Sequence, residues 1–359
     1  MGLRSTGAAR NHCAHGGVYS VDHRRVKLDF SSSVNPLGAP TRAIAAITKG
    51  ARQLVAKYPD PECHDLRKRL AEYTGADPEN VIVGNGAVEI IYWFAKAFAG
   101  RRVVVPAPTF CEYELAACRA GATVDFVHLN RYELEADPVV RAAKGADAVF
   151  LCNPNNPTGL LSNLEVERIL EGVGKETMIL LDECFIELTD DATRNSLVRR
   201  IGEFDNLVVL RSLTKSFALA GLRVGYAVCS RRAAVVMVQQ RIPWNVNGLA
   251  QAAGLAALSS TDYLNRTVKL VAAERKFLLQ RLSGMKSFAP HRSDANFFLL
   301  KVGDRDSTRF RDELLAERGI LVRDCSTFTG MDTHHVRIAV RNRSENIALI
   351  RAMEAFDAG

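Results

Sequence analysis

The chain has 359 residues, a net charge of +7 at pH 7, 47% hydrophobic residues and 24% charged residues. This length exceeds what one compact core holds and favours one large domain with a smaller one. No apolar run reaches the roughly 18 residues of a membrane-spanning helix, and residues 1–15 lack the apolar stretch of a secretory signal. Basic residues are interleaved with acidic ones, which favours a solvated surface over a nucleic-acid interface.

Eight cysteines are scattered along the chain without CxxC pairs. This spacing argues against a zinc site or a disulfide framework and is typical of a reducing cytosol. We therefore expect a cytoplasmic protein that holds no metal.

The middle of the chain alternates short apolar runs with helical patterns such as Leu164–Gly172. The runs are rich in Val, Ile and Leu and are bounded by turn residues, which predicts strands. The predicted strands are Arg102–Pro106, Thr123–Leu129, Ala146–Cys152, Met178–Asp182, Leu207–Arg211 and Val224–Cys229. Runs that are apolar throughout suit a sheet covered on both faces. The pattern therefore predicts an α/β fold with a mostly parallel sheet between helices.

From about residue 261 the pattern changes to that of a smaller α+β domain. We expect, in order, a helix at Tyr263–Leu282, a strand at Asn296–Val302, a helix at Ser307–Arg318, strands at Ile320–Arg323 and His335–Val340, and a helix from Ser344. The first 40 residues are irregular, and we expect them to lie across the larger domain and its active site. The predicted division is therefore an N-terminal segment at residues 1–40, a large domain at 41–260 and a small domain at 261–359.

Polar residues follow three of the predicted strands at the point where each strand ends, and in such sheets ligands bind at the carboxyl ends of the strands. The first group is the loop Asn153–Gly159 (NPNNPTG), which holds two asparagine amides between prolines and a glycine. A surface turn alone needs fewer such residues. The second is Asp182, a carboxylate that is costly to bury unpaired. A salt bridge, a helix cap or a protonated pyridine nitrogen would each provide its partner.

The third strand end carries Lys215, which precedes the largely apolar residues 217–222. A lone lysine is usually a solvated surface charge. Lysine forms Schiff bases best, however, where burial or nearby cations lower its pKa. Ser212, Thr214 and Arg223 stand close to it in the sequence as candidate phosphate ligands.

These residues belong to a set of motifs by which the chain resembles, over nearly its whole length, the fold-type I pyridoxal-phosphate (PLP) enzymes of the aspartate aminotransferase superfamily. The motifs are His15-Gly16-Gly17, Asp29-Phe30-Ser31, Asn35-Pro36-Leu37-Gly38, Tyr58-Pro59-Asp60-Pro61, Gly84-Asn85-Gly86-Ala87, Pro108–Tyr113, Asn153–Gly159, Arg211–Lys215, Gly221-Leu222-Arg223, Arg323-Asp324-Cys325 and Arg337–Arg341. The resemblance implies a large PLP-binding domain, a small C-terminal domain and a homodimer with shared active sites. It also implies a small phosphorylated amino acid as substrate.

The resemblance implies a role for each matching residue. Lys215 would form the Schiff base with PLP and move the proton, Asp182 would pair with the pyridinium nitrogen, Asn156 would bond the ring O3′, and Phe110 would stack on the ring. The implied ligands of the cofactor phosphate are Gly86, Ala87, Ser212, Arg223 and, from the neighbouring subunit, Tyr58. The implied substrate ligands are Arg337 for the carboxylate, His15 and Arg323 for the phosphate, and Gly16, Asn35 and Asn156 close by.

Two positions depart from the pattern of related aminotransferases. Phe185 stands where a tyrosine often gives O3′ a second hydrogen bond, so Asn156 is expected to be the main partner of O3′. This departure resembles the decarboxylase branch of the superfamily. Val88 replaces a small hydroxyl residue, so one contact to the cofactor phosphate is expected to be missing.

Decarboxylation and transamination both remain open, because the bond that breaks at Cα is the one held perpendicular to the cofactor ring, and motifs do not settle this positioning. The segments His15–Gly17, Pro108–Glu114, Arg211–Lys215 and Arg323–Cys325 resemble the threonine-phosphate decarboxylases of cobalamin biosynthesis. We therefore expect decarboxylation of L-threonine O-3-phosphate, with histidinol-phosphate aminotransferase activity as the alternative. A non-catalytic PLP-binding regulator is disfavoured because the lysine is present and a DNA-binding extension is not.

Overall fold

The central sheet is built from apolar runs that are buried on both faces, as their uninterrupted hydrophobicity predicts. The computed structural model describes residues 15–260 and 262–357. The strands of this sheet are β2 (Val81–Gly84), β3 (Arg102–Ala107), β4 (Thr123–His128), β5 (Ala148–Cys152), β6 (Met178–Asp182), β7 (Leu207–Ser212) and β8 (Gly225–Cys229). Each predicted strand is present, with ends shifted by no more than two residues.

The seven strands lie in the order β2-β8-β7-β6-β5-β3-β4. Strand β8 is antiparallel to both of its neighbours, and the other pairs are parallel. Strand β2 was not predicted, and it reaches its place at the edge only by pairing with the reversed β8. The prediction of a mostly parallel sheet is therefore confirmed.

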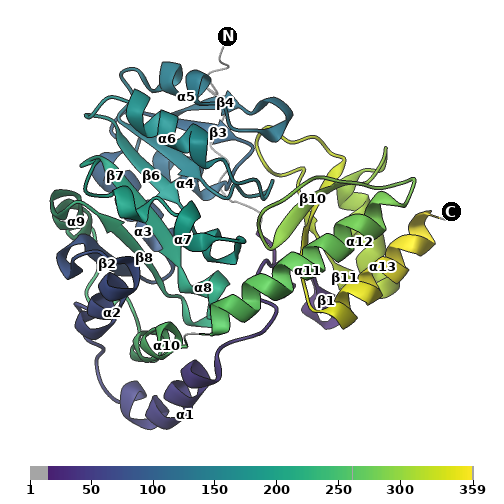
Figure 1. Cartoon of the computed structure of the whole chain (residues 1–359), viewed down its shortest axis with the longest axis horizontal. Helices are drawn as coiled ribbons and strands as arrows, with labels where there is room; N and C mark the ends of the chain where they lie inside the picture. The colour runs from purple at the N-terminus through teal and green to yellow at the C-terminus, as the bar shows by residue number, and fades with distance from the viewer. Residues whose placement is uncertain (1–14, 261, 358–359) are drawn as a thin grey trace.

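Helices cover both faces of the sheet (Figure 1). On one face pack α3 (Ala87–Phe98), α4 (Glu112–Arg119) and α9 (Arg231–Val238), and on the other α2 (His64–Thr74), α5 (Ala136–Ala143), α6 (Asn163–Gly172) and α10 (Gly248–Leu258). Successive side chains of β5 point to opposite faces of the sheet. Phe150 therefore packs with the first group of helices, and Val149 and Leu151 pack with the second. Helix α1 (Thr41–Val55) packs on α10 at the foot of the molecule in Figure 1.

The remainder of the chain forms a four-stranded sheet in the order β12-β13-β10-β9. Its strands are β9 (Ala289–Pro290), β10 (Phe297–Lys301), β12 (Arg323–Asp324) and β13 (His335–Ala339), and its helices are α11 (Tyr263–Ser283), α12 (Ser307–Arg318) and α13 (Arg343–Asp357). Figure 1 shows α11 running from beside the larger sheet to the smaller one. The predicted helices and strands of this part are thus present, with one exception.

The exception is the single strand predicted at Ile320–Arg323, which is divided in two. Strand β12 joins the four-stranded sheet, whereas β11 (Ile320–Leu321) pairs in parallel with β1 (Leu28–Asp29) from the N-terminal segment. A hydrogen bond from the Ala339 amide to the Phe30 carbonyl continues this link. Part of the N-terminal segment therefore lies against the smaller sheet, and the division at residues 40 and 260 stays a prediction.

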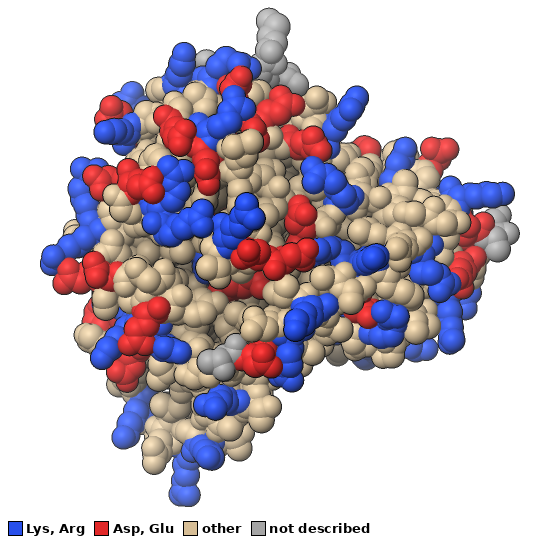
Figure 2. Space-filling view, viewed as in Figure 1, with Lys and Arg blue, Asp and Glu red and all other residues tan. Residues whose placement is uncertain are grey.

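The surface carries charges of both signs. Figure 2 shows basic and acidic side chains interspersed over the visible face rather than gathered by sign. Within residues 15–260 and 262–357, no helix has both the length and the apolar character needed to cross a bilayer.

A buried ion network centred on Arg211 of β7 lies behind the carboxyl edge of the sheet. The Arg211 guanidinium is 3.1 Å from the Glu183 carboxylate and 3.4 Å from the Glu187 carboxylate, and none of the three residues is more than 5% exposed. Tyr73 of α2 donates a hydrogen bond to Glu187. Because side chains alternate along a strand, Glu183 faces away from Asp182, which precedes it. The network therefore links the carboxyl ends of β6 and β7 on the side that faces away from Asp182.

Replacing Arg211 with alanine should destabilise the fold strongly, because two buried carboxylates lose their cation. Removing one partner of a buried ion pair costs about 3–5 kcal/mol, and urea unfolding of the purified variant measures the loss. The matched control is Arg231→Ala, because Arg231 forms an exposed ion pair with Glu79 at 2.9 Å and such pairs contribute about 1 kcal/mol or less. Equal unfolding midpoints for the two variants would contradict the stabilising role of the network.

Candidate active site

A cavity of about 320 Å³ opens at the carboxyl ends of β5, β6 and β7, on the side that faces the four-stranded sheet. Its wall combines segments far apart in the sequence, which fits the rule that ligands bind at the carboxyl ends of parallel strands. The predicted site residues that line it are His15, Gly16, Ala87, Phe110, Asn156, Asp182, Ser212, Lys215, Arg223, Arg323 and Arg337.

Asp182 ends β6 with its carboxylate held from two sides. The Tyr113 hydroxyl donates to Oδ2 at 2.8 Å, and the Cys184 amide donates to Oδ1 at 2.9 Å. Burial raises the pKa of Asp182, although both hydrogen bonds and the Lys215 charge act in the opposite direction. A cationic group beside this buried carboxylate would offset its desolvation. Tyr113 stands within one of the sequence motifs, and no role was predicted for it.

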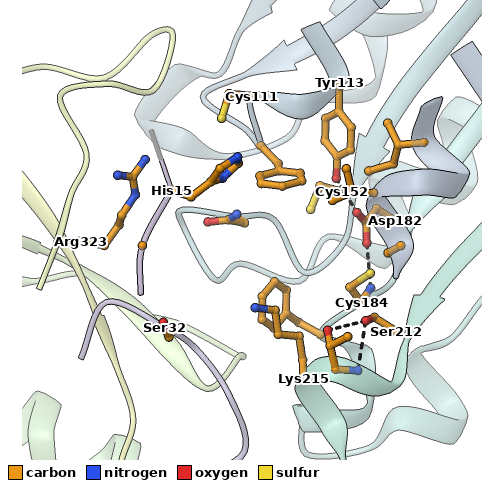
Figure 3. A pocket seen from close by; sticks show the side chains of 18 of the residues that line it. His15, Ser32, Cys111, Tyr113, Cys152, Asp182, Cys184, Ser212, Lys215 and Arg323 are labelled. Carbon is orange, nitrogen blue, oxygen red and sulfur yellow. Dashed lines mark hydrogen bonds between the residues drawn. The ribbon is translucent and has the colours of Figure 1, made fainter. Parts of the chain in front are cut away.

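Lys215 lies on α8 (Leu213–Ser216), a single helical turn that starts directly after β7. Burial lowers the pKa of Lys215 to about 8, and the charges of Arg337 and Arg223 act in the same direction. A substantial fraction of the amine is therefore neutral near pH 8, as a nucleophilic lysine requires. Figure 3 shows Lys215 and Asp182 in the same cavity, with Cys184 between Asp182 and Ser212 in the view.

The N-terminus of α3 is a candidate anion site. Gly86 precedes the helix with φ of +82°, which L side chains rarely adopt, and a Cβ there would lie 2.6 Å from the Arg223 guanidinium, which would have to move. The Ser212 hydroxyl, 2.6 Å from that of Thr214, lies on the same cavity wall. Helix N-termini and arginines both favour phosphate. Val88 adds only apolar surface to the lining, which agrees with the missing hydroxyl contact that the sequence predicts.

Asn156 and Arg337 contact each other across the cavity wall. Arg337 Nη1 donates to Asn156 Oδ1, so the Asn156 amide nitrogen stays available as a donor. Arg337 Nη2 donates to the Ser31 carbonyl at 2.7 Å. Phe185 packs edge-on against Phe297 and offers no hydrogen bond. That Asn156 is the main partner of the ring oxygen stays a prediction.

His15 and Arg323 lie on the side of the cavity away from Asp182 in the view of Figure 3. His15 Nε2 is 2.8 Å from the Glu112 carboxylate. The Arg323 guanidinium stacks over the Phe328 ring with 5.1 Å to the centroid and donates to the Thr327 hydroxyl. Glu112 stands within one of the quoted motifs but was assigned no role, and Phe328 was not singled out from the sequence.

Three predicted residues lie outside the cavity lining. Gly86 contributes backbone only. Asn35 instead supports the lysine turn, because its amide donates to the Ser216 carbonyl and the Thr267 hydroxyl, and its backbone amide donates to the Lys215 carbonyl. Tyr58 is 83% exposed, and its expected contact with a neighbouring subunit stays a prediction.

Cys111 on the cavity wall corrects one expectation. The residue is disulfide-bonded, whereas the cysteine spacing argues against a disulfide framework. In the part of the chain that the structure describes, the free thiols are those of Cys63, Cys118, Cys152, Cys184, Cys229 and Cys325.

The residues present fit the cofactor that the sequence predicts. A pyridinium nitrogen would relieve the desolvation of the Asp182 carboxylate, and an aldehyde would meet the partly neutral amine of Lys215. The phosphate would bind at the Gly86–Ala87 helix start with Ser212. Residues from separate sequence motifs therefore lie where they could bind the ring nitrogen, the aldehyde and the phosphate of one cofactor molecule.

The cofactor-free protein should show a Lys215 amine that titrates near pH 8. Acylation by acetic anhydride, followed for the Lys215 peptide by mass spectrometry, should accelerate with pH and reach half its limiting rate there. Because the Arg337 charge lowers this pKa, Arg337→Gln should move the inflection to higher pH. Arg341→Gln is the control, since Arg341 pairs with Glu345. A wild-type inflection at the usual lysine value, about 10.4, would contradict the burial argument.

Comparison with known proteins agrees with this geometry. A family model described as aminotransferase class I and II matches residues 25–353. Histidinol-phosphate aminotransferase 2 of Archaeoglobus fulgidus is 36% identical over 329 residues, which cover 91% of this chain and 92% of that protein.

Two crystal structures share the fold. One is the histidinol-phosphate aminotransferase from Clostridium acetobutylicum, with a TM-score of 0.87, 30% identity and coverage of 92% of this chain and 99% of that chain. The other is L-threonine-O-3-phosphate decarboxylase from Porphyromonas gingivalis, with a TM-score of 0.82, 27% identity and coverage of 92% and 100%. The fold is that of the fold-type I aminotransferases. The chain belongs to the class I and II aminotransferase family, whose members are PLP-dependent enzymes.

Proposed function

We propose that the protein decarboxylates L-threonine O-3-phosphate to (R)-1-amino-2-propanol O-phosphate, a step of cobalamin biosynthesis. The observation that carries the proposal is the pairing of two buried arginines, Arg323 and Arg337. They are direct partners in the antiparallel strands β12 and β13, and both line the cavity. Such partners have Cα atoms about 5 Å apart and side chains on one face of the sheet.

Two adjacent guanidinium groups favour a ligand with two anionic groups. Burial lowers the pKa of Arg337 to about 10, and the Arg323 charge contributes in the same direction. Within the described ranges Arg337 forms no ion pair, since its hydrogen-bond partners are the neutral groups of Asn156 and Ser31. An anion bound here would therefore stabilise the buried cation.

L-Threonine O-3-phosphate carries a carboxylate and a phosphate separated only by Cα, Cβ and an ester oxygen. This short span matches two cations that lie side by side. Histidinol phosphate has the phosphate but no carboxylate, so it would satisfy only one of them. The arginine pair therefore supports a phosphorylated amino acid with a free carboxylate.

In the proposed reaction PLP supplies the electron sink for the bond that breaks at the substrate Cα. Arg337 binds the carboxylate and thereby orients the bond to Cα. Arg323 and His15 bind the phosphate at the mouth of the cavity. Lys215, whose pKa of about 8 permits proton exchange near neutral pH, returns a proton to Cα after CO2 leaves.

Histidinol-phosphate aminotransferase activity is the second candidate. It is supported by the 36% identity to the Archaeoglobus fulgidus protein of that name. In that reaction the two arginines would bind the two carboxylates of glutamate in one half of the cycle and the histidinol phosphate ester in the other.

A homodimer belongs to the same proposal. Val55, Tyr58 and Trp244 expose 75%, 83% and 50% of their surface, and the Tyr58 and Trp244 rings lie 5.0 Å apart. A second copy that covers these apolar side chains would remove them from water. Tyr58 could then reach the partner's cofactor phosphate, as the sequence resemblance implies.

The experiment that tests the function mixes the purified protein and PLP with L-threonine O-3-phosphate and follows CO2 release. A parallel reaction follows 2-oxoglutarate formation from glutamate with imidazole-acetol phosphate. We expect CO2 without amino-group transfer. Amino-group transfer without CO2 would instead support the aminotransferase and overturn the decarboxylase proposal.

Arg323→Gln should raise the KM for L-threonine O-3-phosphate by one to two orders of magnitude, about the contribution of a charge-assisted hydrogen bond. The rate of CO2 release at saturation should change little, because Arg323 binds a part of the substrate that does not react. Arg292→Gln is the control, since Arg292 pairs with Glu133 on the surface. An unchanged KM in Arg323→Gln would contradict the phosphate assignment.

A further inference from the structure

We propose that Glu112 is a positioning residue that holds the His15 imidazole at the cavity mouth, where it binds the substrate phosphate. The inference rests on the proposed function only in requiring a phosphorylated substrate, and both candidate reactions use one. It concerns a contact between the N-terminal segment and helix α4 rather than the cofactor.

His15 reaches the cavity from a segment that the rest of the chain fastens in place. Its side chain is 51% exposed and its ring centroid lies 6.0 Å from that of Phe110. The next two residues pack on Ser31, because a Cβ at Gly16 would lie 2.5 Å from the Ser31 carbonyl oxygen and the Gly17 amide donates to the Ser31 hydroxyl at 2.7 Å. The imidazole therefore has a defined position although the side chain is half-exposed.

Glu112, the first residue of α4, is 7% exposed, and both of its carboxylate oxygens have partners. Oε1 lies 2.8 Å from His15 Nε2, and Oε2 accepts a hydrogen bond from the Tyr92 hydroxyl at 2.8 Å. The hydrogen bond to His15 is the main reason that the pKa of Glu112 is lowered, against the effect of burial. The carboxylate is thus ionised and its orientation is set by Tyr92.

An ionised carboxylate on Nε2 determines what the other imidazole nitrogen presents. Because an ionised carboxylate can only accept a hydrogen bond, the Nε2–H donates to Glu112, and Nδ1 is left as the nitrogen that a substrate phosphate can meet. Among the residues that the structure describes, Nδ1 has no hydrogen-bond partner. The charged groups around this position are Glu112, Arg119 (5.4 Å from the Tyr92 ring) and Arg323 on the same side of the cavity.

His15 and Arg323 lie on the same side of the cavity in Figure 3, away from Asp182 and Ser212. The substrate phosphate would bind beside these two side chains, at a place distinct from the start of α3. Glu112 itself does not line the cavity. It would therefore act on the substrate through His15 and not by direct contact.

The test replaces Glu112 with glutamine, which keeps the shape and one acceptor oxygen but removes the charge. We expect the KM for the phosphorylated substrate to rise roughly tenfold, about the contribution of one charge-assisted hydrogen bond, with little change in kcat. Glu114→Gln is the matched control, because Glu114 lies in the same first turn of α4 and its side chain contacts Thr329 rather than His15. A KM that does not change in Glu112→Gln would overturn the proposal.

Ligand affinity separates positioning from a general structural effect. Titration of the PLP-loaded protein with L-threonine O-3-phosphate, followed by the cofactor's absorbance, should show a roughly tenfold weaker Kd in Glu112→Gln. The Kd for L-threonine, which lacks the phosphate, should not change. Equal weakening of both ligands would show a structural role and overturn the proposal.

A double-mutant cycle tests whether Glu112 acts through His15. Adding Glu112→Gln to His15→Ala should produce no further rise in KM, whereas additive losses would contradict the coupling. Should Glu112→Gln fail to fold, Tyr92→Phe takes its place, because it releases one carboxylate oxygen while His15 keeps the other. No rise in KM in that variant would count against the proposal.

The proposal can fail independently of the function. If the wild-type protein releases no CO2 but transfers the amino group of histidinol phosphate, the same variants are assayed with histidinol phosphate. The decarboxylase proposal is then lost, and the Glu112 proposal is decided by the KM for that substrate.

Discussion

Burial of charge at the carboxyl ends of β6 and β7 is the constraint on which the site depends. Asp182 and Lys215 leave water there, so burial raises the pKa of the carboxyl group and lowers that of the amine. Burial thus favours the neutral form of each. A cofactor with a basic ring nitrogen and an aldehyde uses both effects, because it offers the carboxylate a cation and the amine an electrophile. The helix start at Gly86 and Ala87 is the candidate site for the phosphate of that cofactor.

Two buried arginines show how the same side chain serves structure in one place and binding in another. Arg211 lies between two carboxylates, so its charge is balanced within the protein and ties strands together. Among the residues that the structure describes, Arg337 has only the neutral partners Asn156 and Ser31, so under the proposed function the bound substrate balances its charge. Both are at most 7% exposed, so the difference comes from their partners and not from their burial.

The cavity exists because two sheets and the N-terminal segment meet. Arg337 of the smaller sheet donates to Asn156 in the loop after β5, and a Cβ at Gly159 of that loop would lie 2.2 Å from the Ser293 hydroxyl oxygen. Strand β1 pairs with β11, and His15 contacts helix α4. Under the proposed function, the residues that bind the cofactor and those that bind the substrate therefore lie on different groups of secondary-structure elements. Their relative placement sets which bond of the substrate is held for cleavage.

The sequence by itself determined the elements and the chemical residues that end them. Apolar runs between turns are local signals, so the strands that lead to Asp182 and Lys215 were predicted within two residues. Only the tertiary structure decided which distant groups meet. Three contacts depend on strand register and helix packing. They are the hydrogen bond from Tyr113 to Asp182, the contact of Glu112 with His15, and the hydrogen bond from the Asn35 amide to the Lys215 carbonyl. No local periodicity encodes such contacts, because they join residues that pack against each other only after the two sheets have assembled.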